Sequence, residues 1–354
     1  MKIISAKMDA DCARCGGCRI RCAFLQKYDN PGEIAKAVRS TPQSEWPDPF
    51  ECSLCGLCGS VCSEELKPDA LFLEMRRAMV EAGVVELDRY APLLSFEEKG
   101  KSDQYSLFRL PQGGDTVLFP GCGLSETRPK TVRHLFQALA LTIPDLGIVL
   151  DCCLKPSHDL GRQAFFEEHF EALHKKLIDA GVKRILTSCP NCFKVFKAYC
   201  PDIRITTVYE VLADAGYIPE SPAGGSAVVH DPCPGRYESG TQEAVRTLAS
   251  ACGIELSEME NNRKFTHCCG EGGAVRFVNE EFSANWTDQR VEQADGRRII
   301  TSCAGCNRFL GDSAQVDHIL EEVLGTKARF SLPWPLSSLT RLWLKRWFRK
   351  NVSG

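Results

Sequence analysis

A chain of 354 residues is long enough for two or three domains, each with its own hydrophobic core. A formal net charge of −3 gives no electrostatic basis for binding nucleic acid. The 20 cysteines are the unusual feature. Residues 1–8 lack the apolar core of a signal peptide, and no segment approaches the roughly 20 apolar residues of a membrane-spanning helix. We therefore expect reduced, metal-binding cysteines in a cytoplasmic protein, either free or on the inner face of a membrane.

Two cysteine runs come first in the chain, and both have the spacing C-x2-C-x2-C-x3-C. The first run comprises Cys12, Cys15, Cys18 and Cys22, and the second comprises Cys52, Cys55, Cys58 and Cys62. In two-cluster ferredoxins, three thiolates of such a run hold one cubane [4Fe–4S] cluster and the fourth reaches the other cluster. We therefore predict two cubane clusters, with the ligand sets Cys12, Cys15, Cys18, Cys62 and Cys52, Cys55, Cys58, Cys22. Zinc is an alternative for one run, but two runs of identical spacing favour the clusters.

The segment after the second run has the pattern of a helix. Pro68 is well placed as its first residue, and Leu71, Met75 and Met79 give it one apolar face up to Gly83. We expect this helix to shield the clusters from water. The sequence therefore predicts an α-helical ferredoxin-like domain over 1–83. A linker is expected over 84–114, which is mixed in character and contains several glycines and prolines.

The rest of the chain repeats one pattern twice. An apolar run ends at a cysteine (117–122, then 227–233) and is followed by a helical stretch and an adjacent cysteine pair. A second helical stretch then leads to a β-rich run that ends in C-x2-C. Short apolar runs alternating with helical stretches predict α/β units, whose ligands gather at the carboxyl ends of the strands. We expect two duplicated α/β lobes, lobe 1 over 115–222 and lobe 2 over 223–328, facing each other across a cleft.

Each lobe supplies five cysteines in the order C…CC…C-x2-C. Lobe 1 contains Cys122, Cys152, Cys153, Cys189 and Cys192, and lobe 2 contains Cys233, Cys268, Cys269, Cys303 and Cys306. Five thiolates are more than a cubane cluster or a tetrahedral zinc ion needs, and an adjacent pair suits the bridging of neighbouring metals. Cys200 and Cys252 lie outside every set, and we expect them to be small, inert, buried side chains.

This arrangement resembles the cysteine-rich CCG domains of heterodisulfide reductase and its relatives. The resemblance rests on the cysteines and on the segments Phe119–Cys122, His230–Cys233 and His267–Gly273. Over residues 12–320 the layout resembles the D subunit of heterodisulfide reductase. The C subunit of anaerobic glycerol-3-phosphate dehydrogenase and the iron–sulfur subunit of glycolate oxidase share it. The resemblance implies one or two noncubane [4Fe–4S] clusters, one for each complete five-cysteine set, at which a disulfide is reductively cleaved.

Lobe 1 departs from the family signature at one position. Leu154 follows the adjacent cysteine pair, where the CCG signature has a glycine that lets the backbone approach the cluster closely. A noncubane cluster is therefore a firmer expectation for lobe 2 than for lobe 1. The alternatives for one lobe are a cubane cluster or a packed remnant without a cofactor.

The resemblance implies an iron–sulfur oxidoreductase subunit that passes electrons from the ferredoxin module to noncubane clusters for thiol/disulfide chemistry. Its catalytic ligands would be the lobe-2 set, Cys233, Cys268, Cys269, Cys303 and Cys306. His230, His267 and His158 lie near cysteines and could donate protons, or could simply hydrogen-bond sulfur or backbone. Lys155, Arg236 and Arg276 could bind an anionic substrate or offset the charge of the clusters. The alternative function is a pure relay from a flavin dehydrogenase to membrane quinone or cytochrome b, as in anaerobic glycerol-3-phosphate dehydrogenase.

Partner proteins are expected for either function. No G-x-G-x-x-G fingerprint of nucleotide binding occurs, so a flavoprotein or ferredoxin must donate the electrons within a hetero-oligomer. The electrons could pass on to a membrane cytochrome b or to a quinone-reducing subunit. The tail, 329–354, has apolar residues at helical spacing together with basic residues: Leu336, Leu339, Trp343 and Trp347, with Arg341, Lys345, Arg346, Arg349 and Lys350. This pattern is typical of a helix at an anionic membrane surface, and the alternative is a helix docked on the lobes or on a partner.

Overall fold

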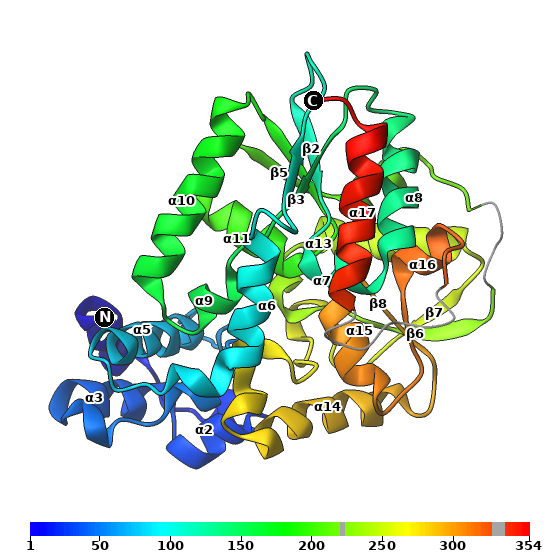
Figure 1. Ribbon diagram of the computed structural model, residues 1–354. Coiled ribbons are helices and arrows are strands. Elements are labelled where there is room, and N and C mark those ends of the chain that lie inside the picture. The colour runs from blue at the N-terminus through cyan, green and yellow to red at the C-terminus, as the bar shows by residue number, and fades with distance from the viewer. Residues whose placement is uncertain (220–223, 328–336) are drawn as a thin grey trace.

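The computed structural model describes residues 1–219, 224–327 and 337–354. A helical N-terminal domain, blue in Figure 1, packs against two lobes that each contain a β-sheet. Lobe 1 is drawn mainly in green and lobe 2 in yellow and orange, and the red C-terminal helix lies beside lobe 1. The three parts are therefore arranged with the ferredoxin-like domain against the lobes rather than at the end of an extended tether.

The N-terminal domain is built from short helices, because its sequence alternates helical segments with cysteine loops. Proline at the first position starts two of these helices, as predicted for Pro68. The core consists of apolar side chains, such as Leu25, Phe72 and Met75, with Cys52 and Cys58 buried among them. The helices are α1 Lys2–Asp11, α2 Ala23–Tyr28, α3 Pro31–Ser40, α4 Leu57–Ser60 and α5 Pro68–Glu81, with 3-10 turns η1 Gly17–Arg19, η2 Gln43–Glu45 and η3 Pro49–Glu51.

Lobe 1 contains a five-stranded sheet in the order β1-β3-β2-β4-β5. Strand β1 runs antiparallel to β3, and the other pairs are parallel. The strands are β1 Leu107–Arg109, β2 Thr116–Phe119, β3 Gly147–Leu150, β4 Arg184–Thr187 and β5 Arg204–Thr207. The helices are α7 Cys122–Thr127, α8 Pro129–Ala140, α9 Lys155–Asp159, α10 Gln163–Asp179, α11 Pro190–Tyr199 and α12 Val208–Asp214.

Lobe 2 contains a parallel four-stranded sheet in the order β7-β6-β8-β9. This order matches that of the parallel strands β3-β2-β4-β5 in lobe 1. The strands are β6 Ser226–His230, β7 Glu255–Glu258, β8 Ile299–Thr301 and β9 Val316–His318. The helices are α13 Ser239–Ala251, α14 Glu280–Ala294, α15 Ala304–Gly311 and α16 Ile319–Val323, with 3-10 turns η5 Cys233–Gly235, η6 Arg263–Phe265 and η7 Gly272–Phe277.

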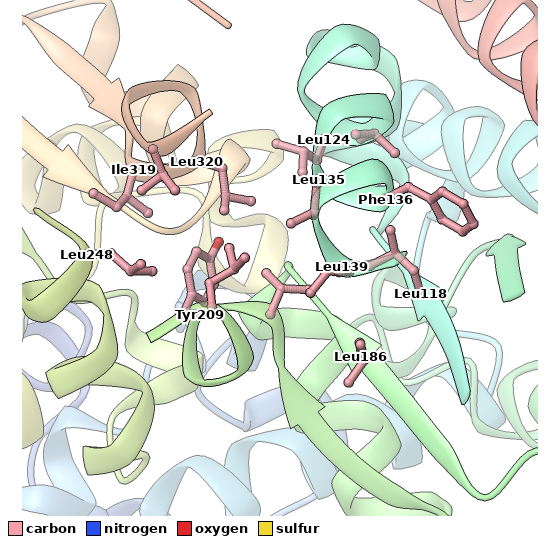
Figure 2. Packing of buried hydrophobic residues seen from close by; sticks show 14 of the residues in the cluster. Leu118, Leu124, Leu135, Phe136, Leu139, Leu186, Tyr209, Leu248, Ile319 and Leu320 are labelled. Atoms are coloured by element: carbon pink, nitrogen blue, oxygen red, sulfur yellow. The ribbon is translucent and has the colours of Figure 1, made fainter. Parts of the chain in front are cut away.

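A single layer of buried side chains joins the two lobes. It contains Leu135 and Tyr209 of lobe 1 together with Leu248 and Ile319 of lobe 2, and Figure 2 shows them converging on one core. Apolar burial of this kind is worth roughly 25 cal/mol for each Å² removed from water. We expected the two lobes to face each other across a cleft. Where this cluster lies, the lobes are instead in direct contact through packed side chains.

Residues 84–114 were expected to form a linker, and they are instead part of the folded body. They contain η4 Leu87–Tyr90, helix α6 Ala91–Lys101 and strand β1, which extends the sheet of lobe 1 beyond the expected boundary at residue 115. Glu97 of α6 is fully buried and accepts hydrogen bonds from the backbone N and the Oγ of Ser157. The burial of Glu97 explains why this segment is folded rather than a linker. A buried carboxyl group needs hydrogen-bond partners, and Ser157 of lobe 1 supplies them.

The C-terminal tail forms helix α17, Ser337–Asn351, which is docked on lobe 1. Leu344 and Phe348 are buried in the core that joins the lobes, and Lys345 Nζ lies 3.0 Å from the carbonyl oxygen of Gln104. The structure agrees with the alternative of a helix docked on the lobes rather than with a membrane-facing helix, since Arg341 and Lys345 are buried. Leu336 lies outside the described residues. None of the described helices is both long and apolar enough to cross a membrane.

Candidate iron–sulfur centres

The two N-terminal cysteine runs adopt the same backbone conformation. In each run the residue before the second cysteine, Arg14 or Leu54, has a positive φ. The glycine after that cysteine, Gly16 or Gly56, also has a positive φ. Left-handed residues at matching positions turn each loop back on itself, which glycine does without steric cost. The two runs therefore present their first three thiols in the same local arrangement.

The fourth cysteine of each run lies beside the other run. The thiol of Cys22 has a pKa raised to about 12, first by burial and then by the nearby Cys55. Cys22 also helps to raise the pKa of two further second-run thiols, those of Cys52 and Cys58. Cys62 lines a cavity whose other cysteines are Cys12, Cys15, Cys18 and Cys58. We call Cys12, Cys15, Cys18 and Cys62 the first-run site, and Cys52, Cys55, Cys58 and Cys22 the second-run site.

The five cysteines of lobe 1 converge at the carboxyl ends of neighbouring strands β2, β3 and β4. The thiols of Cys122 and Cys152 hydrogen-bond each other, and Cys192 contacts both Cys153 and Cys189. The hydrogen bond from Cys192 lowers the pKa of Cys189. Gly121 permits this approach, because a Cβ there would lie 2.8 Å from the Cβ of Cys189. We call these five cysteines the lobe-1 site.

Leu154 takes the backbone conformation that the signature glycine would take. Its φ is 59°, and Gly270 at the matching place in lobe 2 has a φ of 102°. Leu154 N lies 3.4 Å from Cys152 Sγ, and Gly270 N lies 3.4 Å from Cys268 Sγ. A left-handed leucine costs roughly 1–2 kcal/mol, and burial of its side chain in the core of lobe 1 offsets that cost. The departure at Leu154 therefore keeps two features of the lobe-2 backbone, a positive φ and an N–H 3.4 Å from the sulfur of the first cysteine of the pair.

The five cysteines of lobe 2 also converge, and they form the lobe-2 site. The thiol contacts run in a chain through Cys233, Cys268, Cys269, Cys306 and Cys303. A ring nitrogen of His230 and the sulfurs of two of these cysteines all lie within 4.8 Å of one another. Hydrogen bonds from the neighbouring thiols lower the pKa of Cys269. Each lobe thus gathers five thiols in contact, which suits a site that would bind iron through thiolates.

The three candidate histidines occupy different environments. His230 is buried, and its Nδ1 accepts a hydrogen bond from Arg290 Nε at 3.1 Å. Burial lowers its pKa well below the usual range, so the neutral ring carries its proton on Nε2, which has no partner among the described residues. Burial also lowers the pKa of His267 to about 4. His158 contacts Asp159 and Tyr199, at 2.8 and 3.0 Å, rather than a cysteine of either lobe.

The three basic residues considered for an anionic substrate do not gather in one place. Lys155 forms an ion pair with Asp159 within helix α9. Arg236 is buried and donates two hydrogen bonds to the carbonyl oxygen of Cys55, at 3.0 and 3.2 Å. Arg276 is largely exposed. Arg236 therefore joins the N-terminal domain to lobe 2.

The second-run site lies directly against the lobe-2 site. A Cβ on Gly272 would lie 2.5 Å from the carbonyl oxygen of Ser53 and 3.2 Å from Cys268 Sγ. Only glycine fits between these two groups, so the backbone of lobe 2 reaches the second cysteine run without an intervening side chain. Leu57, Cys268 and Trp286 form one buried cluster, against which Cys22, Cys55 and Cys233 pack. The two sites therefore share a buried boundary.

The lobe-1 and lobe-2 sites also meet. A Cβ on Gly123, which follows Cys122, would lie 3.5 Å from the Cβ of Ala304, which follows Cys303. The hydroxyl of Tyr209 lies 2.8 Å from the carbonyl oxygens that precede the two C-x2-C motifs. The four cysteine sites are thus neighbours in a spatial series. The first-run site lies next to the second-run site, which lies next to the lobe-2 site, which in turn lies next to the lobe-1 site.

Three buried arginines lie beside the cysteine sites. The sequence analysis missed Arg76 and Arg290, and it assigned Arg341 to a membrane surface. Arg76 lies beside the second-run site, Arg290 beside the lobe-2 site and Arg341 beside the lobe-1 site, and all three are at most 1% exposed. Arg76 could have been found, because it occupies the apolar face of α5 next to Phe72 and Met75. Arg290 and Arg341 carry no local signal. Cys200 and Cys252 are buried, as expected.

Comparison with known proteins places these sites in recognised domains. The family model described as a 4Fe-4S dicluster domain matches residues 11–67, and the cysteine-rich domain model matches 116–197 and 227–311. The chain is 23% identical to the D subunit of heterodisulfide reductase of Methanosarcina barkeri, over 90% of this chain and 92% of the relative. It is 27% identical to the B subunit of fumarate reductase (CoM/CoB) of Methanothermobacter marburgensis, over 75% and 57%. It is 23% identical to EtfAB:quinone oxidoreductase of Syntrophomonas wolfei, over 75% and 43%.

The fold and the sites define an iron–sulfur protein in which a 4Fe-4S dicluster domain precedes two cysteine-rich domains. Within that class, the chain is similar to the D subunits of heterodisulfide reductase from two Methanosarcina species.

Proposed function

We propose that this chain is the electron-transferring iron–sulfur subunit of an oxidoreductase that acts on disulfides or thiols. The observation that carries the proposal is the contact between the second-run site and the lobe-2 site at Gly272. Two cysteine sites that are separated at Gly272 only by backbone would form a short path for an electron. Relatives of the chain are named as subunits of reductases and as a quinone oxidoreductase, which supports a role in electron transfer.

Electrons would enter at the first-run site. Cys15 is the one exposed cysteine of the four sites, and Ile20 beside that run is 70% exposed. An exposed apolar side chain next to a cluster ligand suits contact with a partner protein. We propose a flavoprotein or a ferredoxin as this donor, in a hetero-oligomer. Electrons would then pass to the second-run site, to lobe 2 and across to lobe 1.

The residues of the four sites fit iron–sulfur clusters. The first-run and second-run sites would each hold a cubane [4Fe–4S] cluster through four thiolates. Each lobe site offers a fifth thiolate, which supports a noncubane [4Fe–4S] cluster in both lobes. A cluster in such a site supplies electrons one at a time. The lobe-2 set, Cys233, Cys268, Cys269, Cys303 and Cys306, would face the substrate.

The reaction must balance electrons and protons. A disulfide RS–SR′ takes up two electrons and two protons, its S–S bond breaks, and two thiols leave. The partner donates both electrons, one after the other. His230 and His267 are neutral and buried, so they serve as hydrogen-bond donors that orient sulfur, and solvent supplies the net protons.

Spectroscopy of the reconstituted full chain tests this proposal. We expect a new paramagnetic signal when glutathione disulfide or cystine is added to reduced and then partly oxidised protein. Cys268→Ser should abolish the signal, whereas Cys252→Ser, at a buried cysteine outside every set, should keep it. If the wild-type chain holds all its iron and gives no signal with a panel of disulfides, disulfide cleavage is refuted.

A pure relay is the second candidate, and the similarity to EtfAB:quinone oxidoreductase favours it. In that case the reduced chain would be reoxidised by menadione in the absence of any disulfide signal. The partner that accepts electrons would then be a membrane cytochrome b or a quinone-reducing subunit. We propose the cytoplasm as the location of the chain, because clustered cysteines that would bind iron as thiolates suit a reducing compartment. Any contact with the inner membrane face would involve Leu339 and Trp343, the exposed apolar residues of α17.

A further inference from the structure

Arg341 of helix α17 is a buried cation for which the described residues provide no ion pair. Its side chain is 1% exposed, and Nη2 donates one hydrogen bond of 2.7 Å to the carbonyl oxygen of Gly100. Its Nε and Nη1 have no hydrogen-bond partner among the described residues. Burying N–H groups of a guanidinium without acceptors is strongly unfavourable. Such an arrangement calls for an anionic group beside the two unpaired nitrogens.

The lobe-1 site lies at that position. A Cβ placed on Gly100 would lie 3.3 Å from Arg341 Nη1 and 3.7 Å from Cys152 Sγ, so both atoms border the same point. Asp151 is the neighbouring carboxylate. It accepts a hydrogen bond from the backbone N of Cys152 at 2.7 Å and forms no ion pair with Arg341. The unpaired edge of the guanidinium therefore faces the region of the Cys152 thiol.

Lobe 2 contains a comparable arginine. Arg290 is fully buried, donates from Nε to His230 and leaves Nη2 without a partner among the described residues. It comes from helix α14, which precedes β8 within the lobe. Helix α10, which precedes β4 in lobe 1, contains no arginine. Lobe 1 therefore takes its buried arginine from the C-terminal helix, beyond the second cysteine-rich domain at 227–311.

We propose that Arg341 is a cofactor-binding residue of the lobe-1 site, and that helix α17 closes that site by holding Arg341 against it. The proposal rests on the proposed function, since it requires an iron–sulfur cluster in lobe 1. A cluster held by five thiolates is anionic, and N–H donors that face its sulfurs stabilise it and raise its reduction potential. The tail is then part of a metal centre rather than a membrane anchor.

The test uses the full chain, reconstituted without oxygen, with four variants. Arg341→Gln removes the charge, and Arg341→Lys keeps it. Gly100→Ala places a methyl group between Arg341 and Cys152 while leaving both residues in place. Arg346→Gln is the matched control, because Arg346 is an exposed arginine of the same helix. Iron and sulfide content and redox titrations followed by electron paramagnetic resonance are the readouts.

We expect Arg341→Gln and Gly100→Ala to shift the lobe-1 signal to a more negative potential or to lose the iron of one cluster. Arg341→Lys should fall between Arg341→Gln and wild type, and Arg346→Gln should match wild type. Unchanged signals from the two cubane clusters show that each variant is folded. If Arg341→Gln and Gly100→Ala keep wild-type iron content and potential, the proposal is overturned.

A double variant separates this inference from the proposed function. Cys152→Ser with Cys153→Ser should remove the iron of one cluster. If it removes none, lobe 1 has no cofactor and the proposed function fails for that lobe. If it removes iron while Arg341→Gln changes nothing, only the role of Arg341 is refuted. Trypsin cleavage at Arg346 and Arg349 is an independent readout, since cluster binding should slow it in wild type and not in Arg341→Gln.

Discussion

The hydroxyl oxygen of Tyr209 in lobe 1 lies 2.8 Å from the carbonyl oxygen of Ser302 in lobe 2. It lies equally close to the carbonyl oxygen of Ser188 in its own lobe. These serines come directly before Cys303 and Cys189. One buried hydroxyl therefore ties together the loops that carry the C-x2-C motifs of both sites.

Tyr209→Phe should destabilise the chain by about 1–3 kcal/mol, because two buried carbonyl oxygens lose the one O–H proton that they share. Unfolding in denaturant, followed by circular dichroism, measures the change in free energy. Tyr237→Phe is the control, since Tyr237 is 63% exposed. Equal stability of the two variants would show that water or another group replaces the hydroxyl.

Arg76→Met should destabilise the chain by about 3 kcal/mol or more. The Arg76 guanidinium is fully buried and donates to carbonyl oxygens of all three parts of the chain, those of Pro49, Phe50, Cys52, Asp159 and Gly273. Its loss leaves these acceptors unsatisfied at the junction of the N-terminal domain and the lobes. Denaturant unfolding measures the effect, and the exposed Arg89→Met should have almost none.

Cys22→Ser should remove or convert the cluster of the second-run site while leaving the first-run site loaded. The reason is the position of Cys22 among the second-run thiols. Cys62→Ser should do the reverse. Iron content and paramagnetic resonance of the two variants distinguish the sites, with Cys200→Ser as the buried control. Loss of the first-run signal in Cys22→Ser would contradict the crossed ligand assignment.

Glu97 should make stability fall as the pH rises. Burial, the largest cause, raises the pKa of Glu97 above the ordinary glutamate value of about 4.3. A group whose pKa is raised in the folded state contributes its stability below the unfolded value and loses it as the pH rises through the folded value. Melting temperatures from about pH 4, near the unfolded value, to about pH 7 should therefore decline more for wild type than for Glu97→Gln. Parallel declines would argue against a raised pKa.

The parts of the molecule that could be predicted from the sequence are those with local signals. Ligand spacing within a cysteine run is a property of a few consecutive residues, and the repeated pattern of the lobes follows from the alternation of apolar runs and helices. The role of 84–114 could not be predicted, because Glu97 is stabilised by contacts with Ser157, distant in sequence. Arg341 was assigned to a membrane surface for the same reason. Its partner at Gly100 lies 241 positions away.

The layer of side chains that joins the two lobes has a consequence for how the molecule works. Parting the lobes would expose Leu135, Leu248 and Phe348 to water, together with the rest of that layer. Hinged opening and closing is therefore a poor way to control the reaction. The relative positions of the four cysteine sites would therefore be set when the chain folds. Redox state would then be communicated by charge, through neighbouring groups such as the buried arginines, rather than by moving one lobe against the other.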